Sequence, residues 1–270
     1  MAYFSIDFYS KSVMRITNMK VIIPNDLLPV MMDGNKAYER PTGLLILLHG
    51  FSGASMDWVT GSRVQELAIA YNLMIVMPSG DNSFYLNGKG SDMAYEDLIA
   101  KEIPEYLRKT FCMDFIPENT YIGGLSMGGF GAIHTGLKYP EIFGKIFALS
   151  SALIVDQIAG LKPETQDPAL MLDFDYYERC FGNLDQLKNS ENDPEFLVTK
   201  HLQGGSRIPE IYMACGTEDF LLKENREFRD FLIQNNVMLD YHESQGIHDW
   251  KFWNQYLEPA IEWLTQEEKA

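Results

Sequence analysis

Short, uninterrupted apolar runs recur along this chain, and longer stretches with helical periodicity lie between them. Continuous apolarity over about five or six residues is typical of strands that are buried on both faces, as in a parallel sheet. Five such runs, with one alternating run near the C-terminus, predict strands at 44–49, 73–78, 120–124, 145–150, 210–216 and 237–242.

Amphipathic stretches predict the helices between these strands, at 61–71, 92–110, 126–138, 223–234 and 249–266. The first 25 residues alternate apolar and polar positions instead, which predicts an antiparallel hairpin at one edge of the sheet. Strands and helices that alternate after an antiparallel start predict an α/β fold. We therefore expect a mostly parallel central sheet with antiparallel N-terminal strands and helices on both faces.

One segment, 151–207, interrupts this rhythm with a mixed, polar composition and with Pro163, Pro168 and Pro194. We interpret it as a helical, cap-like or lid-like insertion over the carboxyl edge of the sheet, and not as an independent domain. Residues 1–270 are then a single domain, which is long for one unit but within the range of α/β folds.

Composition narrows the class of protein further. The chain is 46% hydrophobic and 22% charged, as soluble globular proteins are, and no run approaches 18 apolar residues. The three cysteines show no disulfide or metal-binding pattern, and the N-terminus has no signal peptide, so we expect a cytoplasmic protein. A formal charge of −16 argues against nucleic acid or an anionic membrane as partner.

The stretch "YIGGLSMGGF" contains Gly124-Leu125-Ser126-Met127-Gly128, a G-x-S-x-G pattern between a predicted strand and a predicted helix. In a nucleophile elbow the serine occupies a strained turn, and small residues on both sides let strand and helix approach closely. The phosphate-loop alternative is disfavoured, because no lysine follows and no G-x-G-x-x-G fingerprint is present. Ser126 is therefore the candidate nucleophile.

A serine hydroxyl needs a general base, and the order expected for this elbow is serine, acid, histidine. His248 lies on the loop between the last predicted strand and the last helix, where an imidazole can reach the serine, whereas His242 falls within that strand. The acid should follow a strand upstream, where "ACGTEDFL" offers Asp219 and its neighbour Glu218. We favour Asp219 and His248, with Glu218 and His242 as the alternatives.

Two backbone N–H groups are candidates for an oxyanion hole. Met127 begins the helix after the serine, and Phe51 follows His49-Gly50 at the end of an early strand. His49 itself is expected to shape the turn. Aromatic residues near the predicted mouth could line a substrate pocket or pack beneath loops: Trp58, Phe84, Tyr85 and Trp250.

Five motifs stand in an order that resembles the esterase D-like branch of the α/β-hydrolases, in particular the bacterial tributyrin and acetyl esterase group. They are "LLHGFSGASMDW", "VMPSGDNSFY", "YIGGLSMGGFGA", "CGTEDFL" and "GIHDWKFW", spread over residues 44–253. The resemblance implies a serine carboxylesterase that prefers short acyl chains, uses no cofactor or metal and assembles as a dimer or tetramer. Ser126, Asp219 and His248 match the family's catalytic triad, and Phe51 and Met127 match its oxyanion donors.

Other activities of the same fold stay open at this point. An acyltransferase would replace water by another acceptor, and feruloyl or acetyl-sugar esterases would differ in the ester that they cleave. A lipase is disfavoured because the insertion contains no strongly apolar lid helix. A non-catalytic binding module is disfavoured because no member of the candidate triad is missing.

Overall fold

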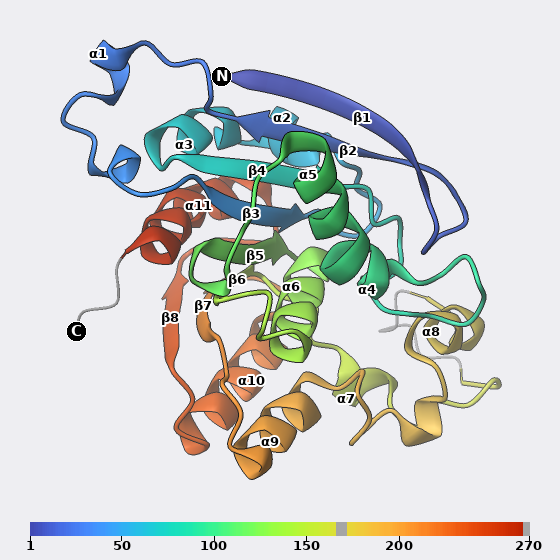
Figure 1. Ribbon diagram of the computed structural model, residues 1–270. Coiled ribbons are helices and arrows are strands. Elements are labelled where there is room, and N and C mark those ends of the chain that lie inside the picture. The colour runs from blue at the N-terminus through green and yellow to red at the C-terminus, as the bar shows by residue number, and fades with distance from the viewer. Residues whose placement is uncertain (166–171, 267–270) are drawn as a thin grey trace.

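Within residues 1–165 and 172–266, which the computed structural model describes, eight strands form one sheet in the order β1-β2-β4-β3-β5-β6-β7-β8 (Figure 1). β1 pairs antiparallel with β2, and β2 antiparallel with β4, whereas every other neighbouring pair is parallel. The predicted edge hairpin and mostly parallel sheet are thus confirmed. The strands are β1 (Ala2–Ser10), β2 (Arg15–Ile23), β3 (Gly43–Leu48), β4 (Leu73–Pro78), β5 (Thr120–Leu125), β6 (Lys145–Leu149), β7 (Glu210–Gly216) and β8 (Leu239–Ser244).

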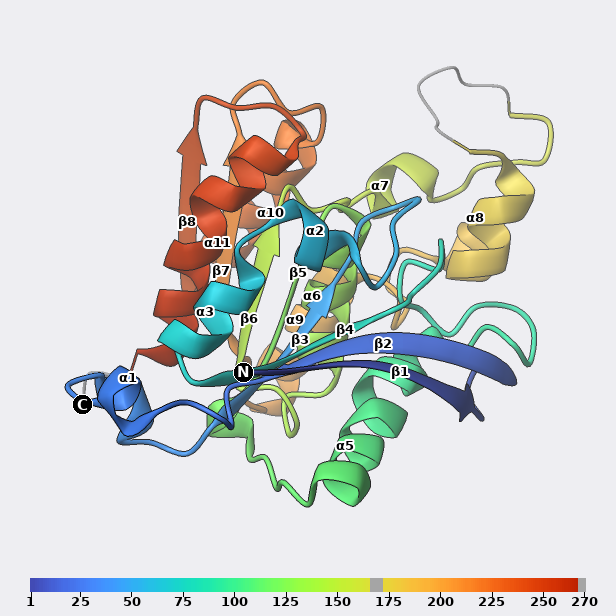
Figure 2. The same ribbon diagram turned by 90° about the horizontal axis from the view of Figure 1, so that it is seen from above.

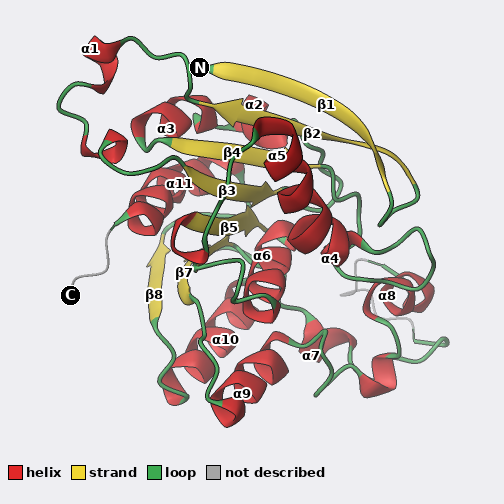
Figure 3. Cartoon of the chain, in the orientation of Figure 1, coloured by secondary structure: helices red, strands yellow, loops and turns green. Residues whose placement is uncertain are grey.

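Helices cover both faces of the sheet, as Figures 1 and 3 show. Side chains of β3 alternate between the two hydrophobic clusters: Ile46 packs with residues of α5, α6 and α10, and Leu45 with residues of α2, α3 and α11. Both are fully buried, which explains the unbroken apolar run. The helices are α1 (Pro29–Met32), α2 (Asp57–Gly61), α3 (Val64–Ala70), α4 (Tyr95–Asp97), α5 (Ile103–Phe111), α6 (Met127–Lys138), α7 (Val155–Ile158), α8 (Phe174–Phe181), α9 (Pro194–Gly204), α10 (Leu222–Gln234) and α11 (Trp250–Thr265).

The helix predicted at 92–110 runs without a break from Tyr95 to Phe111, so it begins three residues later than predicted, and its winding is not uniform. It consists of α4, a π-helical turn at Leu98–Glu102, and α5. Pro104 has no N–H, and its ring excludes the carbonyl of the residue four before it, so the turn that precedes α5 widens. The helix predicted at 61–71 corresponds to α3, and α2, which precedes it, was not predicted.

The predicted insertion is helical where the structure describes it, and 166–171 lie outside the described residues. α7 and α8 lie beyond the carboxyl ends of the strands (Figure 2). The last helix of the insertion, α9, instead packs against α6 on a face of the sheet. Tyr177, Phe181 and Leu197 of the insertion share a hydrophobic cluster with the strands, which favours a single domain; that assignment stays a prediction. No helix in the described ranges is long and apolar enough to cross a bilayer.

Candidate active site

Ser126 stands alone between β5 and α6 in a strained backbone conformation, with φ 54° and ψ −119°. Few residues other than glycine adopt such angles, and they persist only where the surroundings fix them. Here the Ser126 N–H donates to the carbonyl of Leu149 (2.9 Å), while its own carbonyl accepts from Phe130 N–H (3.1 Å) and Ala152 N–H (3.0 Å). These bonds hold the turn, and the side chain stays partly exposed above the sheet.

The glycines around Ser126 permit a close approach of backbone to backbone. A Cβ added at Gly124 would lie 2.4 Å from the carbonyl oxygen of Gly128. One added at Gly128 would lie 2.4 Å from the carbonyl oxygen of Leu48, at the end of β3. No side chain fits at either position without moving the helix, which explains the glycine pattern.

Ser126, His248 and Asp219 form one chain of hydrogen bonds. His248 Nε2 lies 2.9 Å from Ser126 Oγ, and its Nδ1 lies 2.9 Å and 3.0 Å from the two carboxylate oxygens of Asp219. A carboxylate accepts only, so Nδ1 donates and Nε2 is left to accept the serine proton. The alternatives lie elsewhere: Glu218 is exposed, and His242 is on β8 beside Asp240.

The carboxylate of Asp219 is fully buried and yet held in its ionised form. Burial alone would raise its pKa. The hydrogen bond and charge of His248, the Leu221 N–H (2.9 Å) and the Ser150 hydroxyl outweigh this effect and bring the pKa below its ordinary value. A buried, ionised carboxylate is what an imidazole needs in order to become protonated during a reaction.

Three residues that the sequence analysis did not single out surround His248 and Asp219. Trp253 Nε1 donates to Ser150 Oγ (3.1 Å), so α11 supports the residue that follows β6. The rings of Phe220 and Trp253 lie 4.5 Å and 5.1 Å from the imidazole, between centroids. Phe220 is 66% exposed, which makes it an aromatic wall open to solvent beside the histidine. Their partners are distant in sequence, so no local pattern indicates them.

The loop after β3 lies directly against the serine. A Cβ on Gly50 would lie 3.5 Å from Ser126 Cβ, and Gly53 N–H closes a turn on the Gly50 carbonyl (3.1 Å). Neither Phe51 N–H nor Met127 N–H is paired with a protein acceptor among the described residues. Met127 also begins α6, where the helix dipole favours negative charge. Both groups are thus free to donate to an oxyanion.

The imidazole of His49 holds this loop from within the structure. Burial lowers the pKa of His49, which favours the neutral ring. Its Nε2 accepts from Gly80 N–H (2.9 Å), so Nδ1 carries the proton and donates to the Gly50 carbonyl (2.7 Å). His49 therefore joins the loop after β3 to the loop after β4.

The aromatic residues predicted as substrate contacts require a correction, because Trp58, Phe84 and Tyr85 are 1%, 5% and 0% exposed. Trp58 Nε1 donates to the Leu48 carbonyl, and Tyr85 OH to the His49 carbonyl, both at 3.0 Å. These two hydrogen bonds fix the end of β3 from within the core. Phe84 packs between Phe130 and Phe181.

The fourth predicted substrate contact, Trp250, is half-buried. Its ring is wedged between Trp58 and Trp253, with centroids 5.2 Å and 5.3 Å away. It also lies so close to Gly61 that a Cβ there would be 2.6 Å from the ring. These contacts indicate a packing role for Trp250 in α11.

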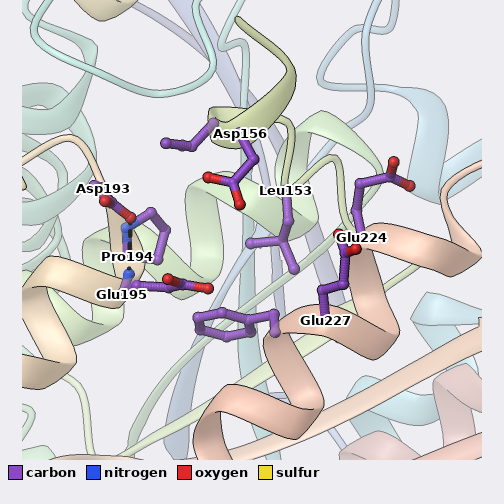
Figure 4. A pocket seen from close by; sticks show the side chains of 9 residues that line it. Leu153, Asp156, Asp193, Pro194, Glu195, Glu224 and Glu227 are labelled. Carbon is purple, nitrogen blue, oxygen red and sulfur yellow. Dashed lines mark hydrogen bonds between the residues drawn. The ribbon is translucent and has the colours of Figure 1, made fainter. Parts of the chain in front are cut away.

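A separate pocket of about 30 Å³ lies between α7, α9 and α10 (Figure 4). Ser126, Asp219 and His248 are not among the residues that line it. Its walls are acidic, but Asp156 pairs with Lys188 and Asp193 caps α9 by accepting from Glu195 N–H. The space suffices for about one water molecule, too little for an ester. No group of three or more His, Cys, Asp or Glu among the described residues is arranged to hold a metal ion.

Comparison with known proteins assigns a family to this fold and site. The family model described as "Putative esterase" matches residues 17–264. An acetyl esterase of Caldicellulosiruptor saccharolyticus is 41% identical over 271 residues, covering 98% of this chain and 99% of the relative.

Solved structures show the same relationship. The substrate-bound fluorophosphonate-binding serine hydrolase F (FphF) of Staphylococcus aureus has a TM-score of 0.82 at 28% identity, with 98% and 99% of the two chains covered. The S-formylglutathione hydrolase FrmB of the same organism has a TM-score of 0.80 at 28% identity, with the same coverage. The chain therefore belongs to this esterase family, and it is a carboxylesterase with an α/β-hydrolase fold.

Proposed function

We propose that the chain hydrolyses short-chain acyl esters through an acyl-enzyme intermediate on Ser126, with His248 as general base and Asp219 as the residue that orients it. The observation that carries the proposal is the unbroken hydrogen-bond chain from Asp219 through His248 to a serine on a strained turn. Such a serine is a poor nucleophile alone, and the adjacent imidazole makes its attack feasible at neutral pH.

In the first half of the reaction, His248 Nε2 takes the hydroxyl proton as Ser126 Oγ forms a bond to the ester carbonyl carbon. The carbonyl oxygen becomes an oxyanion, which accepts hydrogen bonds from Phe51 N–H and Met127 N–H. The imidazolium is stabilised by the carboxylate of Asp219. When the tetrahedral intermediate collapses, the carbon–oxygen bond to the alcohol breaks, and the alcohol leaves with the proton from His248.

In the second half, water replaces the alcohol. His248 takes a proton from water as its oxygen attacks the acyl carbon, and the same two N–H groups stabilise the second oxyanion. Collapse breaks the bond to Ser126 Oγ, which regains the proton, and the carboxylic acid leaves. The preference for short acyl chains is supported by the acetyl esterase that is 41% identical.

The test is hydrolysis of p-nitrophenyl esters from acetate to decanoate by the wild type and by Ser126→Ala. We expect kcat/KM to be highest for the short chains and kcat to fall roughly 10⁵- to 10⁶-fold in the variant, because the nucleophile is lost. Ser151→Ala is the matched control, since the Ser151 hydroxyl is buried next to α6 and takes no part in the mechanism. Equal rates for wild type and Ser126→Ala would refute the assignment of the nucleophile.

The assembly and location of the enzyme remain predictions. The family resemblance implies a dimer or tetramer, which light scattering on the purified protein would measure. A cytoplasmic location is expected from the cysteine pattern, and fractionation of the producing cells would test it.

A further inference from the structure

Two large apolar side chains are exposed beside the proposed triad. Phe220 directly follows Asp219 and is 66% exposed, and Ile247 directly precedes His248 and is 51% exposed. Apolar groups gain free energy when they leave water, so a cluster of them at the surface marks a place where another molecule binds. Here the apolar surface adjoins the two side chains that would activate the serine.

Phe220 and Ile247 belong to loops that are bonded directly to each other. The N–H of Glu218, in the loop after β7, donates to the carbonyl of Gly246, in the loop after β8, at 2.9 Å. A Cβ added at Gly216 would lie 2.3 Å from the same carbonyl oxygen, so the two backbones are in contact. The two loops therefore form one unit, and both exposed side chains extend from it.

The backbone on both sides of Phe220 is fixed by its neighbours. Asp219, before it, is buried and hydrogen-bonded to His248, and its Oδ1 accepts from the N–H of Leu221, after it, at 2.9 Å. Leu221 is itself buried in the hydrophobic core. The Phe220 ring is thus presented 4.5 Å from the imidazole of His248, between centroids, with most of its surface in solvent. A preorganised ring loses little conformational freedom when a ligand covers it.

The proposed reaction brings the alcohol portion of the ester to the same imidazole. His248 Nε2 gives its proton to the departing oxygen, so this oxygen must come within hydrogen-bond distance of Nε2. The carbonyl oxygen instead faces the N–H groups of Phe51 and Met127. The first atoms of the alcohol beyond the departing oxygen therefore lie beside His248, where the exposed ring is.

Two aromatic rings lie against the imidazole of His248 within the described part of the chain, and they differ in exposure. The Trp253 ring is buried and its Nε1 is bonded to Ser150, so it faces the core. The Phe220 ring is open to solvent and has no polar atom. A polar alcohol would lose water there without gaining a hydrogen bond, whereas an apolar alcohol and the ring would cover each other.

We propose that Phe220 is a specificity-determining residue, which contacts the alcohol portion of the ester and favours bulky apolar alcohols. The inference deepens the proposed esterase function and rests on it, because it concerns the leaving group of that reaction. The contact acts in the first half of the reaction only, since the acyl-enzyme no longer contains the alcohol.

The test varies the alcohol and the acyl chain separately. Methyl acetate and benzyl acetate differ in the alcohol, and methyl acetate and methyl butyrate differ in the acyl chain. In Phe220→Ala, the ratio of kcat/KM for benzyl acetate to that for methyl acetate should fall about tenfold, the low end of the discrimination that one apolar contact provides. The ratio for methyl butyrate to methyl acetate should stay within about twofold.

A second measurement separates this role from a structural one. The acetyl-enzyme formed from p-nitrophenyl acetate is the same species whichever ester supplies the acetyl group, and its hydrolysis is followed by stopped flow. Its rate should stay within about twofold in Phe220→Ala, because the alcohol has already left. A ring that served only to position His248 would affect both halves of the reaction, since the imidazole acts in both.

Phe4→Ala is the matched control, because Phe4 is also an exposed phenylalanine but lies on β1, at the edge of the sheet opposite β8. It should leave both ratios unchanged, and Phe220→Tyr, which retains the ring, should keep the benzyl-to-methyl ratio within about twofold. The inference is overturned if Phe220→Ala lowers kcat/KM for all three esters by one factor, changes the acyl-chain ratio or slows hydrolysis of the acetyl-enzyme. If Ser126→Ala cleaves the esters as fast as the wild type, the esterase mechanism fails and the inference with it.

Discussion

The two adjacent carboxylates after β7 have opposite environments, and this difference separates their roles. Asp219 is buried against His248, whereas Glu218 is exposed and its carboxylate accepts a hydrogen bond from Gln245 Nε2 at 3.4 Å. Asp219→Asn preserves shape and can still accept from Leu221 N–H, but an amide cannot hold His248 Nδ1 in its protonated form. We therefore expect kcat to fall about 10³- to 10⁴-fold while the fold is retained.

Glu218→Gln is the matched control for this prediction, since it neutralises the neighbouring carboxylate without touching the imidazole. Its kcat for p-nitrophenyl acetate should stay within about twofold of the wild type. A large loss in Glu218→Gln with an active Asp219→Asn would reverse the assignment of the acid.

At the scale of single residues, the sequence predicts a role only where a local pattern indicates it. Ser126 is indicated by its glycines, and His248 and Asp219 by their place after strands. Asn82 contacts Ser52, and Trp253 contacts Ser150, across 30 and 103 positions of the chain. Such pairs depend on which strands become neighbours, so the motifs could not reveal them. The burial of Trp58 and Tyr85 was equally inaccessible, because aromatic residues suit both a pocket and a core.

At the scale of elements, the close packing of α6 on β3 couples the serine to the oxyanion loop. A methyl group at position 128 would lie 2.4 Å and 2.6 Å from the carbonyl oxygens of Leu48 and His49. Gly128→Ala must therefore displace the helix or the loop. We expect the free energy of unfolding to fall by about 1–3 kcal/mol and kcat/KM to fall at least about 100-fold.

Gly204→Ala is the control, because its added methyl group meets only Ser206 Oγ, at 3.5 Å, near the end of α9. This variant should keep its activity and gain up to about 1 kcal/mol in the free energy of unfolding, since alanine favours helix. Urea denaturation and ester hydrolysis measure both quantities. Full activity in Gly128→Ala would show that the contact is looser than its geometry indicates.

The elements themselves could be predicted wherever hydrophobic periodicity was long and uninterrupted. β4 and β7 have the predicted bounds, and α6 and α10 begin within one residue of the prediction. The π-helical turn inside the helix predicted at 92–110 was missed because the apolar spacing persists through it, and periodicity does not detect such a turn. Short elements such as α2 carry too few residues to show a period.

At the scale of the whole molecule, His134 joins parts of the chain that are distant in sequence. Its ring is fully buried in α6, stacks on Phe130 and bonds through Nε2 to the Glu191 carbonyl (2.8 Å) in the insertion. Burial lowers the pKa of His134 to about 4. The charges of Glu96 and Glu191 oppose this shift, and the charge of Lys138 adds a smaller lowering effect. The fold therefore holds His134 in its neutral form.

This pKa predicts how the stability of the molecule depends on pH. An unfolded chain binds a proton at a histidine near pH 6.5, whereas the folded chain binds it at His134 only near pH 4, so acid favours unfolding between these values. On acidification from about pH 7.5 to about pH 5.5, the proton uptake of the unfolded chain at this histidine should lower the free energy of unfolding by about 1.4 kcal/mol. Both pH values lie above the isoelectric point, which is near 4.7.

Urea denaturation at these two pH values measures the effect in the wild type, in His134→Gln and in Thr135→Val. Glutamine can still donate to the Glu191 carbonyl but does not titrate, so the loss on acidification should be smaller in His134→Gln by about 1.4 kcal/mol. Thr135→Val alters a neighbouring buried residue and keeps the imidazole, so it should retain the wild-type dependence. If His134→Gln retained it as well, the titration of other groups would account for acid sensitivity, and His134 would serve packing alone.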